Sequence, residues 1–547
     1  MEFGRKIENC RMCGSNELYE FLDLGFLPPA DGILSKEALE HPEINFPLKV
    51  AQCRGCGLTQ LTYAVDPKLL YDEKYSYESS VTETGKKHFY DMAESICNRF
   101  GLKEELIVDI GSNVGVLLEG FKKKGCKVLG IDAAPKIVKI ANERGIETWN
   151  NLINKDVAKR IVKEKGQASV VCGTNVFAHI DDKKGLMASV DCLLNEEGIF
   201  VIEFPYLVDL IDNLEYDTIY LDHLEYLSIK PLISFFDSYG FQIFDVEKYG
   251  IHGTSLRVFV CRKGKKTVES SVEKFLKLED GKQVYEKETL NNFANNVRAH
   301  RRAFLGMLYD LKKEGKKIVG ISAPAKGNTL LNYCKIDKNI IEWMTEKSEI
   351  KQGHYTPGMH IPIVPEEKLI EEGADYGVIF AWNFAKEIAA NKINTEFVKG
   401  GGKLINPIPK PIIMEQETNL FGAEVKNIGP AFMDERGIIS DLLNETIAHV
   451  GLITTEDGTI RANHYHKLST QHSYILSGSF EVLLAPADQP ANVKKVLLRS
   501  GEMISIPPNI IHRFKAIDRT VMIDMVSESR DGTGYEDDVY RVKIEMQ

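Results

Sequence analysis

The chain has 547 residues, of which 43% are hydrophobic and 27% charged, and its net charge is −11. At roughly 150 residues per domain this length predicts three or four domains. The acidic balance argues against nucleic acid as a partner, because a phosphate backbone attracts a basic surface. No apolar run approaches the roughly 18 residues of a membrane span. Since we also find no secretory signal, we expect a cytoplasmic protein that contacts no membrane.

Two C-x-x-C pairs mark the first segment, residues 1–85, which we interpret as a zinc-binding domain. Their members are Cys10, Cys13, Cys53 and Cys56. Two residues between the cysteines of a pair let one tight turn aim both sulfurs at one ion, and a glycine follows each pair. The pattern predicts a closed, structural four-thiolate Zn²⁺ site with no open position for a substrate. The alternative is four unrelated free thiols.

Short apolar strands alternate with helical stretches over residues 86–262, which predicts a mostly parallel sheet covered on both faces. The first strand leads into a glycine-containing turn that opens a helix, and the residues of this turn are Asp109, Gly111, Asn113 and Gly115. Glycines here let backbone amides approach a ligand at the carboxyl edge of the sheet. The next strand ends at Asp132, whose carboxylate can accept hydrogen bonds from ribose hydroxyls.

The cofactor of this segment follows from the spacing of that turn. NAD is the natural competitor, but the turn lacks the dinucleotide spacing G-x-G-x-x-G. Its pattern D-x-G-x-x-x-G resembles the first motif of class I S-adenosylmethionine (SAM) methyltransferases, which have a Rossmann-like fold. Asn175 and His179 follow the fourth strand, where such enzymes line the methyl-transfer face. The alternative is a Rossmann-like unit without a cofactor.

Two further domains complete the predicted organisation. Residues 263–413 begin with a charged helical stretch and continue as a second α/β domain, which closes at the proline-rich segment 405–412. Residues 414–547 change to short β runs separated by turn residues, which predicts a small β-barrel or jelly roll. The fold class is therefore multidomain α/β plus β.

The order of these features resembles the sugar C-methyltransferases that act on deoxysugars. Those enzymes combine a four-cysteine zinc domain, a SAM domain and a C-terminal α/β domain with a loop like residues 320–332 of this chain. The resemblance covers about residues 7–413. It implies SAM as methyl donor, structural zinc and a nucleotide-linked keto sugar as substrate, with dTDP as the family's usual nucleotide.

The resemblance also implies catalytic residues. Residues 75–80 look like the family's Y-x-Y-x-S-S segment, which lies over the active site, and residues 220–223 look like its Y-H-E-H stretch, whose last histidine is the favoured base. His179 matches the histidine after the fourth strand. The implied catalytic residues are therefore Tyr75, Tyr77, His179, Tyr220, Asp222 and His223. Leu221 replaces a histidine and Asp222 a glutamate, which weakens the substrate assignment.

The chemistry explains these residue types. A C–H bond loses its proton only if an adjacent carbonyl can hold the charge as an enolate, and a 4-keto sugar supplies this at C3. Histidine titrates near neutral pH and suits the base, for which His223 is the candidate. Tyrosine hydroxyls or His179 could donate to the enolate oxygen. A structural histidine bonded to Asp222 is the alternative for His223.

The last segment carries the spacing of the cupin motifs. The residues that fit are Arg461, His464, His466, Gln471, Gly478, Gly501, Pro507 and His512. Three histidines and a glutamine could bind a second divalent metal. The same pattern resembles the metal-free sugar 3,4-ketoisomerases and keto-sugar 3,5-epimerases, in which histidine is the base. We favour epimerisation at C5 by His464 and His466, because a methylated C3 has no proton left to move.

Other functions remain open from the sequence. The cupin could be a non-catalytic sugar-binding or dimerisation module, which would make the chain a homodimer with a single activity. The SAM domain could also methylate an oxygen or a small metabolite. Our main hypothesis is a bifunctional enzyme that C-methylates and epimerises a nucleotide-linked 4-keto-6-deoxyhexose.

Overall fold

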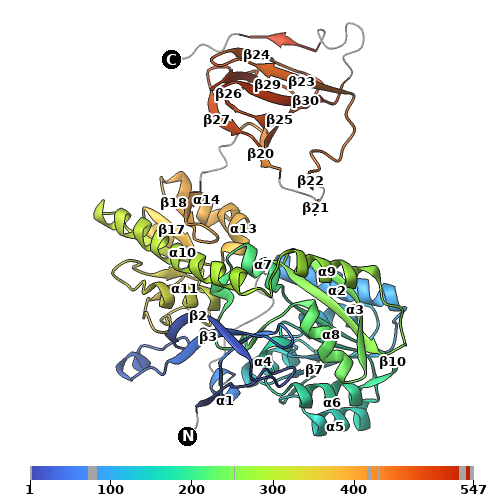
Figure 1. Ribbon diagram of the computed structural model, residues 1–547. Coiled ribbons are helices and arrows are strands. Elements are labelled where there is room, and N and C mark those ends of the chain that lie inside the picture. Colours follow the sequence, from blue (N-terminus) through green and yellow to red (C-terminus); the bar gives the residue numbers. More distant parts are fainter. Residues whose placement is uncertain are drawn as a thin grey trace. The chain divides into compact units, whose positions relative to one another are not determined.

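The computed structural model describes residues 3–71, 83–251, 253–414, 420–428, 432–434, 437–528 and 538–542. The chain divides into two compact units, Met1–Met414 and Glu415–Gln547 (Figure 1). Among the described residues, no helix is long and apolar enough to cross a membrane. Tyr75 and Tyr77, which the family resemblance places over the active site, lie outside the described residues.

A small antiparallel sheet combines the N-terminal segment with one strand from far along the chain. Its order is β11-β4-β3-β2, and β1 and β5 form a separate ribbon. The bounds are β1 Gly4–Lys6, β2 Leu18–Leu27, β3 Phe46–Cys53, β4 Thr59–Leu61, β5 Tyr63–Val65 and β11 Glu225–Tyr226, with the short helices η1 Glu37–Glu40 and α1 Pro67–Leu70. Glu225 pairs with Gln60 and Tyr226 with Thr59. The stretch 220–223 therefore runs directly into the N-terminal sheet.

A seven-stranded sheet forms the centre of the first unit, in the order β12-β13-β10-β9-β6-β7-β8. The five strands from β10 to β8 run parallel, whereas β13 is antiparallel to β10 and to β12. The bounds are β6 Leu106–Ile110, β7 Lys127–Asp132, β8 Thr148–Asn150, β9 Ala168–Thr174, β10 Leu194–Pro205, β12 Phe241–Tyr249 and β13 Ser255–Arg262. Strand β6 is buried at every position, as expected for a parallel strand covered on both faces.

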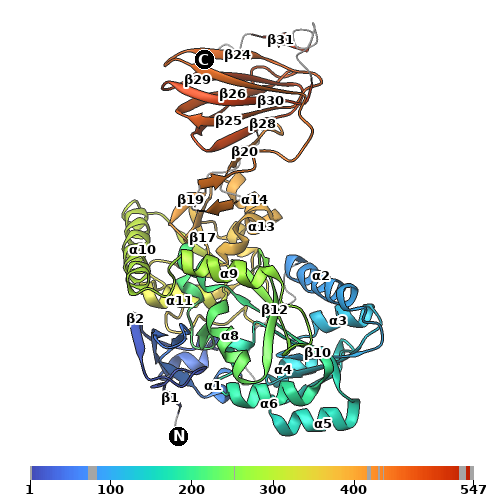
Figure 2. The same ribbon diagram turned by 45° about the vertical axis from the view of Figure 1, so that its right-hand side comes forward.

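Helices cover both faces of this sheet. One face carries α2 Glu83–Phe100, α3 Val116–Lys123 and α4 Pro135–Glu143. The other carries α5 Lys155–Lys165, α6 Lys183–Leu193, α8 Ile229–Ser238 and α9 Ser270–Gly281. Figure 2 shows α2 and α3 side by side. Three short helices follow β9 and β10: η2 Phe177–His179, α7 Leu207–Asp212 and η3 Tyr216–Thr218.

The second α/β region has a six-stranded sheet in the order β16-β15-β14-β17-β18-β19. Only β19 is antiparallel to its neighbour. The strands are β14 Ile318–Ile321, β15 Met344–Thr345, β16 Ile363–Val364, β17 Tyr376–Ile379, β18 Lys403–Asn406 and β19 Ile412–Met414. The helices are α10 Lys287–Lys313, α11 Ala325–Cys334, α12 Lys368–Glu371, η4 Trp382–Phe384, α13 Ala385–Ala390 and α14 Lys392–Lys399.

The N-terminal sheet and the second α/β region share one hydrophobic core. It contains Leu22 and Val50 from the N-terminal sheet, Val297 of α10, Leu330 of α11 and Val378 of β17, all 1% exposed or less. The predicted zinc domain is thus packed as one body with the C-terminal α/β region. This packing fixes the loops that carry the candidate catalytic residues.

The second unit contains two five-stranded antiparallel sheets, in the orders β20-β28-β25-β30-β23 and β27-β26-β29-β24-β31. The bounds are β20 Glu424–Asn427, β23 His449–Thr455, β24 Ile460–Tyr465, β25 Gln471–Ser477, β26 Ser479–Pro486, β27 Lys494–Arg499, β28 Glu502–Ile506, β29 Ile510–Ala516, β30 Thr520–Val526 and β31 Tyr540–Arg541, with a small pair β21 Phe432–Asp434 and β22 Gly437–Ile439. Phe480, Val482, Ile504 and Phe514 fill the core. The predicted fold class, multidomain α/β with a jelly-roll-like C-terminal unit, is confirmed.

Candidate functional site

The four paired cysteines converge at one end of the N-terminal sheet, and their sulfurs all lie within 4.8 Å of one another. Cys10 Sγ lies 3.6 Å from Cys56 Sγ, and Cys13 Sγ lies 3.5 Å from Cys53 Sγ. A tetrahedral zinc with Zn–S bonds of about 2.3 Å holds its sulfurs about 3.8 Å apart, so the four thiols fit one ion. The turn after Cys53 closes through Gly57, whose φ of +89° favours glycine.

The residues predicted to bind SAM gather at the carboxyl edge of the central sheet: Asp109, Gly111, Asn113, Gly115, Asp132 and Asn175. The amide of Asn113 donates to Asp132 Oδ2 over 2.9 Å, so the turn after β6 is tied to the end of β7. A Cβ on Gly111 would lie 2.6 Å from Val176 Cγ2. Only glycine therefore allows the turn to pass so close to the segment after β9.

Several buried polar atoms at this edge lack a hydrogen-bond partner among the described residues. They are Asp109 Oδ1, Ser112 Oγ and Asn175 Oδ1. Buried polar atoms are otherwise paired in native proteins, so this cluster indicates a polar ligand. Burial and the nearby Asp132 raise the pKa of Asp109 to about 8. SAM carries ammonium, sulfonium and ribose hydroxyl groups. These groups fit a site that offers acceptor oxygens and a carboxyl that a nearby cation would ionise.

His223 lies in the loop between η3 and β11. Its Nδ1 is 2.7 Å from the carbonyl oxygen of Thr218. A carbonyl can only accept, so Nδ1 carries the proton and Nε2 carries the lone pair. The ring packs against Tyr220 at a centroid distance of 3.9 Å, with the two ring planes inclined by 34°, and lies 4.9 Å from the ring of His179. The loop thus holds an oriented imidazole of the tautomer that a base at Nε2 needs.

His179 lies at the end of η2 and contacts a residue that the sequence pattern did not identify. The hydroxyl of Tyr71 is 3.1 Å from His179 Nδ1. Burial, His223 and Lys183 together place the pKa of His179 well below its usual value, so the ring is neutral. Tyr71 follows α1 and precedes residues 72–82, which include the Y-x-Y-x-S-S segment and lie outside the described residues. No spacing distinguishes it from other tyrosines.

The two departures from the family pattern lie in different environments. Leu221 is 1% exposed and belongs to the shared hydrophobic core. Asp222 is 5% exposed, and its Oδ2 has no hydrogen-bond partner in the described part of the chain. Burial and the nearby Asp31 raise the pKa of Asp222 to about 8. Leu221 is therefore a packing residue, whereas Asp222 presents a carboxyl that is protonated at neutral pH.

The loop that resembles the family's C-terminal motif opens helix α11. Asn328 Nδ2 donates to Ala30 O over 2.7 Å, which ties α11 to the N-terminal segment. Lys326 Nζ lies 4.5 Å from the ring centre of Trp382, whose Nε1 donates to Asp217 Oδ2 over 2.6 Å. Part of this loop therefore has a structural role. The sequence alone did not distinguish that role from contact with a ligand.

The second unit brings three histidines together, since ligand atoms of His464, His466 and His512 lie within 4.8 Å of one another. Gln471 Nε2 donates to Asp524 Oδ1 over 2.9 Å, which turns its Oε1 toward His466 Nε2 at 3.3 Å. The nitrogen that His512 presents to this cluster is Nε2, because its Nδ1 is 3.0 Å from the carbonyl oxygen of Ile510. Three imidazoles and an amide oxygen fit either proton transfer or a divalent cation.

Comparison with known proteins identifies these regions. Sequence models of protein families match residues 10–71 as a zinc binding domain, 85–246 as a methyltransferase domain, 250–409 as a C-methyltransferase C-terminal domain and 442–534 as a cupin. The chain is 33% identical to the C-methyltransferase NovU of Streptomyces niveus over 418 residues, which is 76% of this chain and 99% of the relative. The chain belongs to the C-methyltransferase family. The predicted relationship is confirmed, and the methyltransferase domain implies SAM as cofactor.

Solved structures that cover about a fifth to a quarter of this chain include two sugar-modifying enzymes. A 3,4-ketoisomerase, QdtA of Thermoanaerobacterium thermosaccharolyticum, is 23% identical, with a TM-score of 0.19 over 22% of this chain and 88% of that protein. The dTDP-4-dehydrorhamnose 3,5-epimerase of Bacillus anthracis str. Ames is 19% identical, with a TM-score of 0.20 over 24% of this chain and 83% of that one.

Proposed function

We propose that this C-methyltransferase transfers a methyl group from SAM to C3 of a nucleotide-linked 4-keto-6-deoxyhexose, with dTDP as the nucleotide. The observation that carries the proposal is the oriented His223, whose Nδ1–H is held by Thr218 O so that Nε2 can accept a proton. Carbon methylation needs such a base, because the C–H bond next to the ketone must be broken before the new C–C bond forms.

The described residues suit each part of this reaction. Nε2 of His223 takes the C3 proton, and the electron pair moves onto the C4 oxygen as an enolate. Neutral His179, with Tyr71 beside it, can donate a hydrogen bond to that oxygen. SAM, when bound, would supply a methyl group activated by the positive sulfur. C3 would form the new bond to this methyl group as the C4 carbonyl re-forms, and the electron pair of the broken S–CH₃ bond would stay on the neutral sulfur of the departing thioether. The proton on His223 then passes to solvent, which restores the base.

The remaining candidate residues have supporting parts in this proposal. Tyr220 packs against the ring of His223 and helps to position it. Asp222, protonated at neutral pH, can donate to a sugar hydroxyl. Tyr75 and Tyr77 would contact the sugar from the segment outside the described residues, as the family resemblance implies. The SAM contacts are assigned to Asp109, Gly111, Asn113, Gly115, Asp132 and Asn175.

The full chain tests the methyl transfer directly. Incubation with ¹³C-methyl SAM and a panel of dTDP-linked 4-keto sugars should give a product heavier by one methyl group, with the label in a C–CH₃ signal of the NMR spectrum. An O–CH₃ signal, or no mass gain with any sugar, would overturn the proposal. His223→Gln should reduce the rate about 10³-fold, whereas the matched control His41→Gln, at an exposed histidine, should keep it.

For the cupin we propose a second reaction, epimerisation at C5 of the same keto sugar. The 4-ketone acidifies the C5 proton as it does the C3 proton, and His464 and His466 are the candidate acid and base. The clustered imidazoles support this proposal, and they also support a divalent cation held by His464, His466, His512 and Gln471. A 3,4-ketoisomerase is the alternative, as is a non-catalytic sugar-binding or dimerisation module.

Two measurements separate these alternatives. Deuterium should enter C5 from D₂O without SAM, and His464→Gln should abolish this exchange while methylation continues. Exchange that survives in the variant would exclude His464 as the base. Metal analysis should find one zinc per chain if the cupin uses only protons. A second equivalent that disappears in His512→Gln would instead assign the cluster to a cation.

A further inference from the structure

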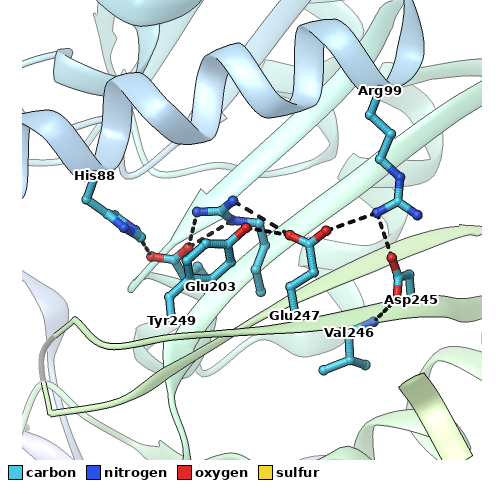
Figure 3. Close-up of polar contacts among 8 residues, drawn as sticks. His88, Arg99, Glu203, Asp245, Val246, Glu247 and Tyr249 are labelled. Atoms are coloured by element: carbon cyan, nitrogen blue, oxygen red, sulfur yellow. Dashed lines mark hydrogen bonds and ion pairs between the residues drawn. The ribbon is translucent and has the colours of Figure 1, made fainter. Parts of the chain in front are cut away.

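A buried ionic network joins helix α2 to the central sheet (Figure 3). His88 Nε2 lies 2.6 Å from Glu203 Oε1, and the Nε and Nη2 atoms of Arg257 lie 2.9 and 2.8 Å from Glu203 Oε2. The side chains of Glu203 and Arg257 are 1% exposed or less. Burial by itself would raise the pKa of Glu203, but His88 and Arg257 more than offset it, so its pKa is lowered and the group is a carboxylate.

The position of Glu203 connects this network to the SAM edge. Glu203 lies at the carboxyl end of β10, in register with Thr174 at the end of β9. Its carbonyl oxygen accepts from the amide of Asn175 over 2.7 Å. Asn175 has a φ of +54° and carries the buried Oδ1 atom without a partner in the described residues. The residue that anchors the network therefore also holds the backbone of a proposed SAM contact.

Helix α2 makes a second contact with the central sheet, at a point farther from the SAM edge. Arg99, near the end of α2, lies 2.6 Å from Asp245 and 3.3 Å from Glu247, both on β12. Glu247 Oε2 is also 3.9 Å from Arg257 Nη1, so Arg99 reaches Glu203 only indirectly, through the partly exposed Glu247. Figure 3 shows His88 and Arg99 reaching the sheet from the two ends of the helix. They are about 16 Å apart along its axis. Both residues tie α2 to the sheet, but only His88 does so beside Asn175.

We propose that His88 is a positioning residue for methyl transfer. Its Nε2–H donates to a carboxylate that can only accept, and together with Arg257 it fixes the side chain of Glu203. A fixed Glu203 side chain keeps the end of β10 in place. Because the amide of Asn175 donates to the carbonyl oxygen of Glu203, the turn that faces SAM is then kept in place as well. Loss of the His88 donor leaves a buried carboxylate with one partner, which the strand end relieves by moving. The role rests on the SAM site proposed for Asn175.

The test compares three variants of the full chain. His88→Leu removes the donor and keeps an apolar side chain against Tyr249 and Phe89, His88→Gln keeps an N–H donor, and Arg99→Leu cuts the remote contact. Calorimetric titration with SAM alone should give a Kd raised about tenfold in His88→Leu, within about threefold of wild type in His88→Gln, and unchanged in Arg99→Leu. Melting temperatures should fall in both His88→Leu and Arg99→Leu, and more in His88→Leu, because Glu203 is fully buried whereas Arg99 and Glu247 are partly exposed.

The outcomes are distinct. Equal SAM affinity in His88→Leu and Arg99→Leu, or no recovery in His88→Gln, would show a purely structural contact and overturn the proposal. Failure of His88→Leu to fold while Arg99→Leu folds would overturn it as well, since the pair would then support the fold itself. Because SAM binding is measured without a sugar, wild-type protein that binds SAM but methylates no keto sugar contradicts the proposed substrate and not the role of His88.

Discussion

The protonation of Asp109 predicts that SAM binds more tightly as the pH rises. Burial and Asp132 raise the pKa of Asp109 to about 8, so its carboxyl is protonated in the ligand-free protein at neutral pH. A ligand cation about 5 Å away stabilises the carboxylate by about 3 kcal/mol at an effective dielectric constant of about 20. This corresponds to a change of roughly 10²-fold in the ionisation constant, so in the complex the pKa of Asp109 lies well below its ligand-free value and the carboxyl is ionised at pH 7. SAM binding should then release about 0.8 proton at pH 7.

The direction and the size of the pH dependence of SAM binding follow from the linkage between proton release and ligand binding. Between pH 6 and 8 the SAM affinity should increase roughly 20-fold, with a plateau above pH 8, where Asp109 is ionised before binding. Isothermal titration in buffers of different ionisation enthalpy measures both the Kd and the released proton. The ammonium group of SAM itself titrates near 8, so the control is Asp109→Asn, which keeps the titration of the ligand. Parallel curves for wild type and Asp109→Asn would refute the reasoning.

Three further results are expected. Cys53→Ser should lose the zinc equivalent measured by plasma mass spectrometry and lower the melting temperature by roughly 5 °C or more; retained zinc would contradict the four-thiolate site. Because burial raises the pKa of Asp222 to about 8, wild-type activity should fall above pH 8 and Asp222→Asn should remove this decline, whereas an unchanged pH profile would exclude Asp222 as a donor. Glu225→Ala leaves the buried Lys183 without its carboxylate partner at 2.9 Å and should lower the free energy of unfolding in urea by about 3–5 kcal/mol, while Glu196→Ala at an exposed ion pair should leave it unchanged.

The spacing of residues in the sequence was enough to predict a feature wherever its geometry depends only on residues that are close together in the chain. The paired cysteines predict a metal site because two residues between thiols fix how one turn presents them. The turn from Asp109 to Gly115 predicts a ligand-binding edge for the same reason, since strand, turn and helix are contiguous. These features need no knowledge of which strands pair. The order of the four regions could also be read from composition changes along the chain.

Contacts between distant segments were not predictable in this way. Strand β11 joins the N-terminal sheet through Glu225 and Gln60, which are separated by most of the methyltransferase region. The contact of Tyr71 with His179 and the network around Glu203 likewise join residues that are far apart in the sequence. Such pairings leave no periodic signal, because each partner is a single polar residue within an apolar strand or loop. The sequence therefore located the candidate catalytic loop but not the residues that orient it.

The ring protons that can be removed from the keto sugar limit how the two proposed reactions can be combined. A 4-ketone acidifies the protons at C3 and C5 only. Once C3 carries a methyl group in place of its proton, 3,4-isomerisation is no longer possible, whereas C5 retains an exchangeable proton. A cupin acting after the methyl transfer must therefore work at C5. A cupin acting at C3 must act first, and if it is a 3,4-ketoisomerase it would move the ketone that the proposed base His223 needs. Epimerisation at C5 is the only one of these reactions that is compatible with either order, which is why it is the stronger partner for carbon methylation in a single chain.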